Sequence, residues 1–396
     1  MDAKVASTAS GDLSLWDRLM LVGIFPVFAA RLLFGFVIHD KTSLHWRQRL
    51  ALTYLQAQRA SFPIRHLRWL ARRVPTSRAI QQYCDRQGLH RTVVKLDSAS
   101  VGHGIVEFDL PPPTLHFVTP PAPAASPTNE KAPTLLYFHG GGFVNPLRCS
   151  AHMPFIMRCV TACGAKQAVI LDYTLAPEHP YPAQFVQAVS TVRYLVDEMG
   201  LRLEDIILAG DSAGGQLVGA VLAHIAKPAP YVPPLVVDGR FRAALFVSPY
   251  VRVPADAAVG SYESNGQKDY LNRPQVDKFN AAWKGKDDEI WANLCGSEGS
   301  GDVWSKVVAQ GLVEKAMVTV GTAEVFLDCC RLFAQKNLQA ETAVITRDTD
   351  CETLKGKNFV LAECEDEGHV QVALDSVVGY PKGPMTRAVM SWLEAV

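Results

Sequence analysis

Strand-like apolar runs alternate with helical segments over residues 131–396. Runs of roughly four to eight apolar residues bounded by polar or glycine-rich turns are typical of buried strands. Four of them matter most for function: Thr134–Phe138, Ile206–Ala209, Met317–Val320 and Phe359–Ala362. Because helical segments separate these runs, the pattern predicts an α/β fold with a mostly parallel central sheet and helices on both faces.

Other segments complete this core. Thr92 to Val118 predicts the first, antiparallel strands of the sheet, and the Pro- and Ala-rich stretch Pro120 to Pro133 predicts a surface loop or short linker. Residues 253–304, rich in Gly, Asn and charge, form an excursion between two core strands, and Arg347 to Asn358 predicts a polar surface insertion. We therefore expect the core to occupy residues 91–396.

The N-terminal part has a different pattern. Leu19 to Ile38 is an apolar stretch of 20 residues interrupted by Pro26 and Arg31, long enough to cross a bilayer. Three interpretations compete: a membrane anchor, a lid helix over the active site, or a cleaved signal peptide. A signal peptide begins with a positively charged n-region, whereas this segment carries the acidic residues Asp12 and Asp17. Residues 1–43 are thus expected to form an anchor or a lid.

Residues 44–90 are expected to form a helical cap. Its aromatic residues either line a pocket or pack in an ordinary core; they are Trp46, Tyr54, Phe62, Trp69 and Tyr83. Its arginines either mark the cytoplasmic side of a membrane or form a solvated helix face; they are Arg47, Arg49, Arg59, Arg65, Arg68, Arg72 and Arg73.

Two glycine-rich patches follow predicted strands. Gly210-Asp211-Ser212-Ala213-Gly214 fits G-x-S-x-G between an apolar run and a helical stretch, a pattern that places the serine hydroxyl on a sharp, exposed turn. His139-Gly140-Gly141-Gly142-Phe143 lies about 70 residues earlier and can aim backbone N–H groups at a developing oxyanion. The two patches together predict nucleophilic catalysis by Ser212, with the N–H of Ala213 as one oxyanion donor.

The remaining members of a triad follow from chain order, which in such a hydrolase is serine, acid, histidine. Two of the eleven histidines come after Ser212. His224 is twelve residues on, inside the helix that follows the serine, so His369, after the last predicted strand, is the candidate base. Glu324 follows the strand Met317–Val320 and is the candidate acid, with Asp328 as its rival.

At this level the chain resembles the hormone-sensitive-lipase branch of the α/β-hydrolases, the group that includes arylacetamide deacetylase and steryl acetyl hydrolase. The matching motifs are H-G-G-G-F at 139–143, G-D-S-A-G-G at 210–215 and D-Y-x-L-A-P-E at 172–178. The resemblance implies an α/β-hydrolase fold, oxyanion donors at Gly141 and Gly142, and often an N-terminal hydrophobic anchor. It also places an excursion such as 253–304 near the pocket mouth, where it contributes to substrate selection.

The chain departs from this family at the acid. Where the family usually shows Asp-Pro-Leu, the sequence has Glu324-Val325-Phe326, and glutamate is an accepted acid in the fold. Asp211 and Glu178 are expected to hold loops by accepting backbone N–H groups, and His139 to anchor the glycine loop.

Composition excludes several other classes. Thirty-nine basic residues balance 39 acidic ones, so charge does not suggest nucleic-acid binding. Nine cysteines, an odd number with Cys329 and Cys330 adjacent, do not form a convincing disulfide framework. Cys149, Cys159 and Cys163 have no histidine cluster at ligand spacing, so we expect neither a metal site nor any cofactor.

The sequence thus predicts a serine carboxylester hydrolase acting on a small or lipophilic ester, such as an acetylated sterol or secondary metabolite. The alternatives are acyl transfer, amide hydrolysis or polyketide release by the same serine, and a non-catalytic small-molecule binder. We expect a membrane-associated protein, at the endoplasmic reticulum, with a cytoplasmic location as the alternative.

Overall fold

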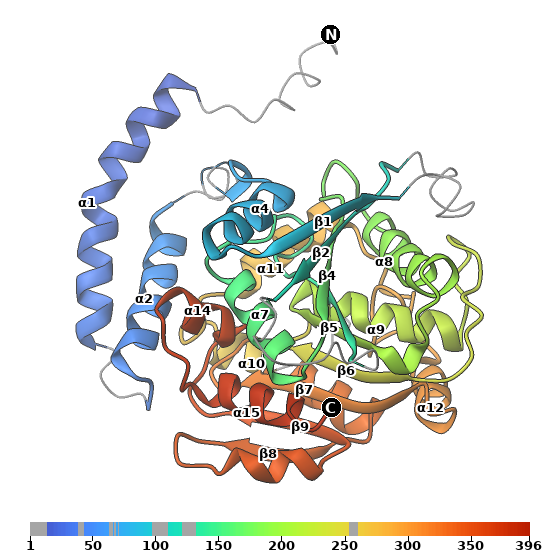
Figure 1. Ribbon diagram of the computed structural model, residues 1–396. Coiled ribbons are helices and arrows are strands. Elements are labelled where there is room, and N and C mark those ends of the chain that lie inside the picture. The colour runs from blue at the N-terminus through green and yellow to red at the C-terminus, as the bar shows by residue number, and fades with distance from the viewer. Residues whose placement is uncertain are drawn as a thin grey trace.

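The computed structural model describes residues 14–38, 43–62, 66, 69, 71–96, 110–120, 132–252 and 260–396. In these residues a nine-stranded sheet runs through the molecule in the order β1-β2-β4-β3-β5-β6-β7-β9-β8 (Figure 1). Strand β2 is antiparallel to β1 and β4, and the other neighbours are parallel. The strands are β1 (His90–Lys95), β2 (Thr114–Thr119), β3 (Thr134–Phe138), β4 (Gln167–Asp172), β5 (Ile206–Asp211), β6 (Phe241–Val247), β7 (Val313–Gly321), β8 (Glu341–Ile345) and β9 (Phe359–Cys364).

This sheet confirms the predicted fold class. Each of the four apolar runs singled out in the sequence lies within a strand, as β3, β5, β7 and β9. The stretch from Thr92 to Val118 contributes the antiparallel pair β1 and β2. Of the predicted loop Pro120 to Pro133, residues 121–131 lie outside the described part of the chain.

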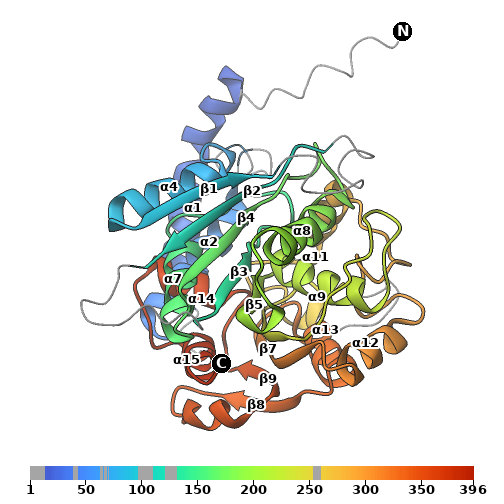
Figure 2. The same cartoon turned by 45° about the vertical axis from the view of Figure 1, so that its right-hand side comes forward.

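Helices cover both faces of the sheet (Figure 2). Along β3, Leu136 and Phe138 belong to one buried cluster, which includes α8 and α9, whereas Leu135 and Tyr137 belong to the cluster that includes α7 and α15. This alternation follows from the two-residue period of a strand. The helices are α1 (Leu15–Ile38), α2 (Trp46–Ser61), α4 (Thr76–Gln87), α7 (His152–Ala162), α8 (Ala183–Arg193), α9 (Ala213–Ala226), α10 (Ser261–Ser264), α11 (Arg273–Trp283), α12 (Ser300–Ala309), α13 (Leu327–Leu332), α14 (Gln371–Val377) and α15 (Pro384–Leu393), with short turns η1 (Tyr194–Glu198), η2 (Leu203–Asp205), η3 (Phe333–Asn337) and η4 (Cys351–Gly356).

The expectation of a polar surface insertion at Arg347 to Asn358 is wrong in part. Turn η4 lies within it, and Cys351 and Leu354 are buried among the side chains of the second cluster. The turn is amphipathic, and its apolar side packs against α15 while its polar side faces solvent. The nine cysteines are all free thiols.

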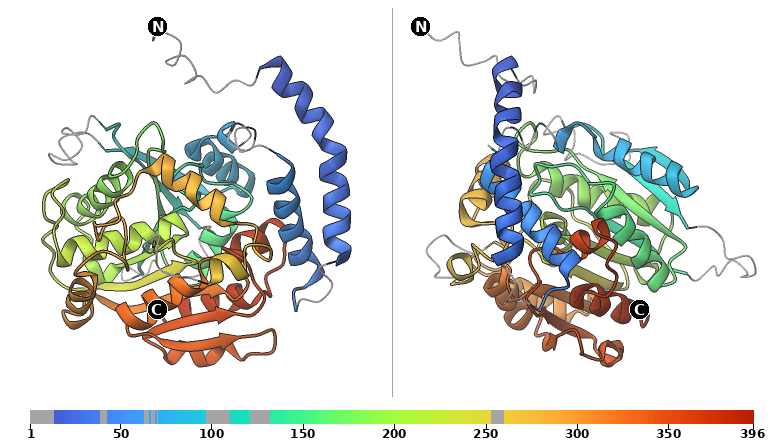
Figure 3. Two further views of the ribbon diagram at one scale, coloured as in Figure 1. Left: turned by 180° about the vertical axis from the view of Figure 1, so that it is seen from behind. Right: turned by 90° about the vertical axis from the view of Figure 1, so that its left-hand side faces the viewer.

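Helix α1 is a long apolar helix on the outside of the molecule. Its segment Leu19–Val37 is long and apolar enough to cross a membrane, with a mean hydropathy of 2.1 and 6% of it buried. It packs along α2, where Phe28 lies between Tyr54 and Phe62, both at ring-centroid distances of 5.5 Å. Figure 3 shows α1 standing beside the body, with α2 between them.

Helix α2, in contrast, is bound to the core. The Arg59 guanidinium donates to the carbonyls of Asp269 and Leu271, each at 3.1 Å. Arg72, further along, forms an ion pair with Glu178 at 2.7 Å. Arg59 and Arg72 therefore join the N-terminal helices to the core. Neither the solvated-face nor the membrane-side interpretation predicted these contacts. Trp46 is half exposed and lines a hollow at the surface, at the start of α2.

Candidate active site

Ser212 lies on the sharp turn between β5 and α9. Its backbone has φ 51° and ψ −116°, a conformation that costs a non-glycine residue roughly 1–3 kcal/mol. The turn is fixed because the Ser212 N–H donates to the Val247 carbonyl at 2.9 Å and its carbonyl accepts the Tyr250 N–H at 2.9 Å. A Cβ at Gly210 or Gly214 would lie 2.4 Å or 1.8 Å from a backbone oxygen, so both positions require glycine.

Three side chains from different loops form one hydrogen-bonded chain at this turn. His369 Nε2 lies 2.9 Å from Ser212 Oγ, and His369 Nδ1 lies 2.8 Å from Glu324 Oε1. Ser212 follows β5, Glu324 follows β7 and His369 follows β9. Parallel strands end at the same edge of a sheet, which explains how residues 157 positions apart meet.

The second oxygen of Glu324 is also bound. Glu324 Oε2 accepts the Ser248 hydroxyl at 2.8 Å and the Gly321 N–H at 3.1 Å. The rival acid, Asp328, instead accepts the Ser261 N–H at 2.9 Å and lies near Arg331. The structure therefore brings Glu324, and not Asp328, to His369.

The imidazole of His369 is fully buried beside negative charge. Burial alone lowers the pKa of His369, but the charge and hydrogen bond of Glu324 outweigh it, with Asp269 adding to them, so that the pKa is raised above 6.5. The rings of Phe326 and Tyr270 lie 5.0 Å and 5.9 Å from the imidazole and limit its movement. The histidine is thus suited to accept a proton and hold it beside Glu324.

The glycine loop after β3 faces the turn. Gly141 and Gly142 have φ of 122° and 62°, and Ala213 is the first residue of α9. Within the described residues the N–H groups of these three residues donate to no protein acceptor. The ring of Phe279 lies 2.8 Å from where a Gly142 Cβ would stand, and Phe143 stacks on Trp283 at 4.4 Å. Helix α11, in the described part of the excursion, therefore packs directly on the glycine loop.

The expected loop-holding residues have the following partners. Asp211 accepts the Tyr137 hydroxyl at 2.7 Å and the Gly140 N–H at 2.9 Å, as predicted. Buried His139 contacts the Gly140 carbonyl at 2.7 Å, and burial lowers its pKa to about 4. Glu178 accepts N–H groups of the Arg72 side chain on both carboxylate oxygens, at 2.7 Å and 2.9 Å.

Two polar residues near His369 escaped the sequence analysis. Ser248 donates to Glu324, as described, and accepts the Val370 N–H at 3.0 Å. Asp269, fully buried, accepts the His369 N–H at 3.2 Å and the Val325 N–H at 2.9 Å. Neither residue belongs to a motif, and the contacts of Asp269 join positions 56 and 100 residues apart. No local pattern points to them.

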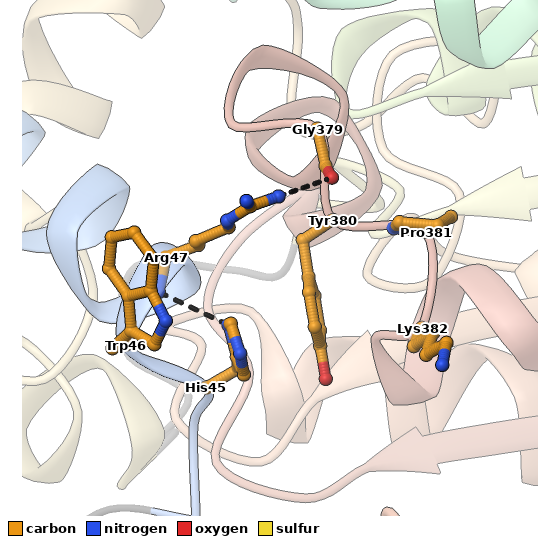
Figure 4. Close-up of a pocket in the computed structure, with 7 residues that line it drawn as sticks. All are labelled: His45, Trp46, Arg47, Gly379, Tyr380, Pro381 and Lys382. Atoms are coloured by element: carbon orange, nitrogen blue, oxygen red, sulfur yellow. Dashed lines mark hydrogen bonds between the residues drawn. The ribbon is translucent and has the colours of Figure 1, made fainter.

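A separate surface hollow of about 490 Å³ lies at the start of α2. Figure 4 shows His45 beside Tyr380, and Arg47 donating to the Gly379 carbonyl. The His45 and Tyr380 rings are stacked, with centroids 4.2 Å apart. None of the three hydrogen-bonded side chains Ser212, His369 and Glu324 lines this hollow. In the described ranges there is also no group of three or more His, Cys, Asp or Glu residues placed to hold a metal ion.

Comparison with known proteins identifies the family. A family model described as the alpha/beta hydrolase fold matches residues 135–352, more than half of the chain. The chain therefore belongs to the α/β-hydrolase family, and its resemblance to the hormone-sensitive-lipase branch is confirmed.

Curated relatives match over shorter stretches. Esterase LipI of Mycobacterium tuberculosis is 40% identical over 26% of this chain and 33% of its own length. Carboxylesterase NlhH of the same organism is 34% identical over 39% of this chain and 45% of its own length. Arylacetamide deacetylase-like 2 of Homo sapiens is 27% identical over 42% of this chain and 41% of its own length. The aligned parts thus span a third to less than half of these relatives.

Solved structures resemble the chain over most of its length. An esterase from the bacterial hormone-sensitive lipase family superposes with a TM-score of 0.59 at 21% identity, covering 89% of this chain and 98% of that one. A thermostable esterase from Pseudomonas putida superposes with a TM-score of 0.57 at 20% identity, covering 81% of this chain and 86% of that one. At these identities the likeness concerns the fold.

Proposed function

We propose that the protein is a serine carboxylester hydrolase in which Ser212 is the nucleophile, His369 the general base and Glu324 the acid. The observation that carries this proposal is the continuous chain from Ser212 Oγ through His369 to Glu324, with distances of 2.9 Å and 2.8 Å. The names of the relatives, esterase and carboxylesterase, support the same chemistry.

In the proposed mechanism, Ser212 Oγ attacks the acyl carbonyl while His369 Nε2 takes the hydroxyl proton. The Glu324 carboxylate keeps Nδ1 protonated and stabilises the imidazolium. The N–H groups of Gly141, Gly142 and Ala213 stabilise the tetrahedral oxyanion. His369 then gives its proton to the departing alkoxide, and water, activated by the same imidazole, releases the acid from Ser212.

We further propose that the substrate is a small or lipophilic ester and that α1 anchors the protein in a membrane. The support is the exposed apolar surface of α1, which includes Trp16, Val22, Phe25, Leu33 and Phe34. In water this surface is unfavourable by about 25 cal/mol per Å². In this scheme residues 1–43 form the anchor, 44–90 join it to the core, and 91–396 carry the chemistry.

The test is a panel of p-nitrophenyl esters of graded acyl length, with a fluorophosphonate probe as a second readout. We expect hydrolysis and labelling by the wild type, and loss of both in Ser212→Ala and His369→Ala. A folded wild type that neither hydrolyses any ester nor reacts with the probe contradicts an enzymatic role and favours the binder. Product analysis with added alcohol distinguishes hydrolysis from acyl transfer.

The membrane proposal has its own test. A Phe25→Lys/Leu33→Lys double variant places charge on the exposed face of α1, at roughly 2.5–3.5 kcal/mol per residue in a bilayer. We expect the wild type in the membrane fraction and this variant in the soluble fraction, with activity on a soluble ester retained. A wild type found in the soluble fraction contradicts the anchor.

A further inference from the structure

Asp269 is a buried carboxylate between α10 and α11, within the excursion over the site. Its side chain has no exposed surface. Oδ2 accepts the N–H of Val325, the residue after Glu324, at 2.9 Å. Oδ1 accepts the N–H of His369 itself at 3.2 Å. One carboxylate therefore joins the loop of the candidate acid to the loop of the candidate base.

Neighbouring groups fix Asp269 in turn. Its N–H donates to the Asn265 carbonyl at 2.9 Å, and the Asn265 side chain donates to the Glu324 carbonyl, also at 2.9 Å. Its own carbonyl accepts from Arg59 of α2 at 3.1 Å. Asp269 is thus held by the excursion on one side and by the N-terminal helices on the other.

The charge on Asp269 acts on the imidazole. The titratable and charged groups that face it are His369, Glu324, Tyr270 and Arg59. Burial, with repulsion from Glu324, raises the pKa of Asp269 to about 6, while His369 and the two N–H donors oppose that rise. The carboxylate is therefore mostly ionised at neutral pH, where it favours a protonated His369.

We propose that Asp269 is a positioning residue for the Glu324–His369 pair, which holds both loops in register and supplies negative charge that stabilises the imidazolium formed during acyl transfer. The inference rests on the proposed function for its catalytic consequence. The effect of Asp269 on the His369 imidazole, however, does not depend on ester turnover. This effect and the proposed ester hydrolysis can therefore be tested separately.

The central experiment uses the full-length Asp269→Asn variant, which keeps the size of the side chain and removes its charge. We expect the pKa of His369, measured by NMR on histidine-labelled protein, to fall by about one unit. We expect kcat on a soluble ester to fall roughly 10- to 100-fold, with little change in KM, because loosened loops misplace the reacting groups. A His369 pKa equal to that of the wild type overturns the proposal, since a merely structural role leaves this titration unchanged.

Two further variants make the result specific. Asp172→Asn is the matched control, because Asp172 is also a largely buried carboxylate that accepts a backbone N–H, from Ser77 at 3.1 Å; we expect it to leave the His369 pKa unchanged. Asp269→Glu keeps the charge but moves the oxygens, so it should lower kcat while preserving most of the His369 pKa. If Asp269→Asn does not fold, wild-type kcat in Asp269→Glu overturns the proposal. Absence of ester hydrolysis by the wild type refutes the proposed function alone.

Discussion

The Ser248 hydroxyl donates a hydrogen bond of 2.8 Å to Glu324 Oε2, on the side of the carboxylate opposite His369. Glu324 Oε1 faces His369 at 2.8 Å, so both oxygens of a fully buried acid are engaged. Ser248 itself has a φ of 45°, and its hydroxyl also accepts the Val370 N–H at 3.0 Å. The acid therefore has one orientation available, and that orientation fixes the imidazole.

This arrangement predicts unequal effects at the two candidate acids. We expect Glu324→Gln to lower kcat by about 10⁴-fold, because the imidazole loses its orienting charge. Asp328→Asn removes the charge that faces Arg331 but keeps an oxygen that can accept the Ser261 N–H, so it should affect stability more than rate. Steady-state kinetics on a soluble ester compares the two variants; a larger loss in Asp328→Asn contradicts the assignment of the acid.

The raised pKa of His369 predicts the pH profile. The base acts only when neutral, so kcat/KM should fall as the pH decreases through a pKa above 6.5. Because this folded-state pKa is raised, the contribution of the His369–Glu324 pair to stability is present below pH 6.5 and is lost as the pH rises through the raised value. A kcat/KM profile with its acid limb below pH 6.5 contradicts the interpretation.

Gly142→Ala should damage the oxyanion loop specifically. At φ 62° the new Cβ lies 2.8 Å from the Phe279 ring, so the loop must shift. We expect kcat to fall by roughly 10²-fold, the loss typical of one oxyanion donor. Gly164→Ala is the matched control, since Gly164 has φ 61° with open space at its Cβ position. It should lose stability alone, and an equal loss of kcat in both variants rules out a specific role for Gly142.

Two further buried acids, Glu367 and Asp375, share one hydrogen-bonding partner on α2. The Gln48 amide donates to Glu367 Oε1 at 2.9 Å and to Asp375 Oδ1 at 3.0 Å. Burial raises the pKa of Asp375 to about 6. Burial and repulsion from Asp375 raise the pKa of Glu367 well above its usual value. This pair also ties α2 to the loop that carries His369.

The pair predicts a stability that depends on pH. Both folded-state pKa values are raised, so the native state binds protons more tightly than the unfolded chain, and its stability decreases as the pH rises through about 6. We expect the urea midpoint to fall from pH 5 to pH 8 in the wild type and to fall less in Asp375→Asn. Exposed Glu394→Gln should keep the wild-type dependence, and an identical slope in all three proteins contradicts the prediction.

The sequence predicted those parts of the site that have local signals. Buried strands are visible as apolar runs, and the turn at Ser212 requires glycines because its backbone approaches its neighbours closely. Glu324 could be predicted from its place after a strand. Asp269 could not, since a single carboxylate in a loop gives no pattern and its partners are distant in sequence. For the same reason the contacts of Arg59 with the core were missed.

The backbone angles of Ser212 have a consequence for the stability of this chain. Glycine adopts φ 51°, ψ −116° without a steric penalty, so the Ser212→Gly protein should be more stable than the wild type by about 1 kcal/mol. Chemical denaturation would measure that gain directly. If Ser212 is the proposed nucleophile, the strained turn that exposes its hydroxyl therefore lowers the stability of the folded chain.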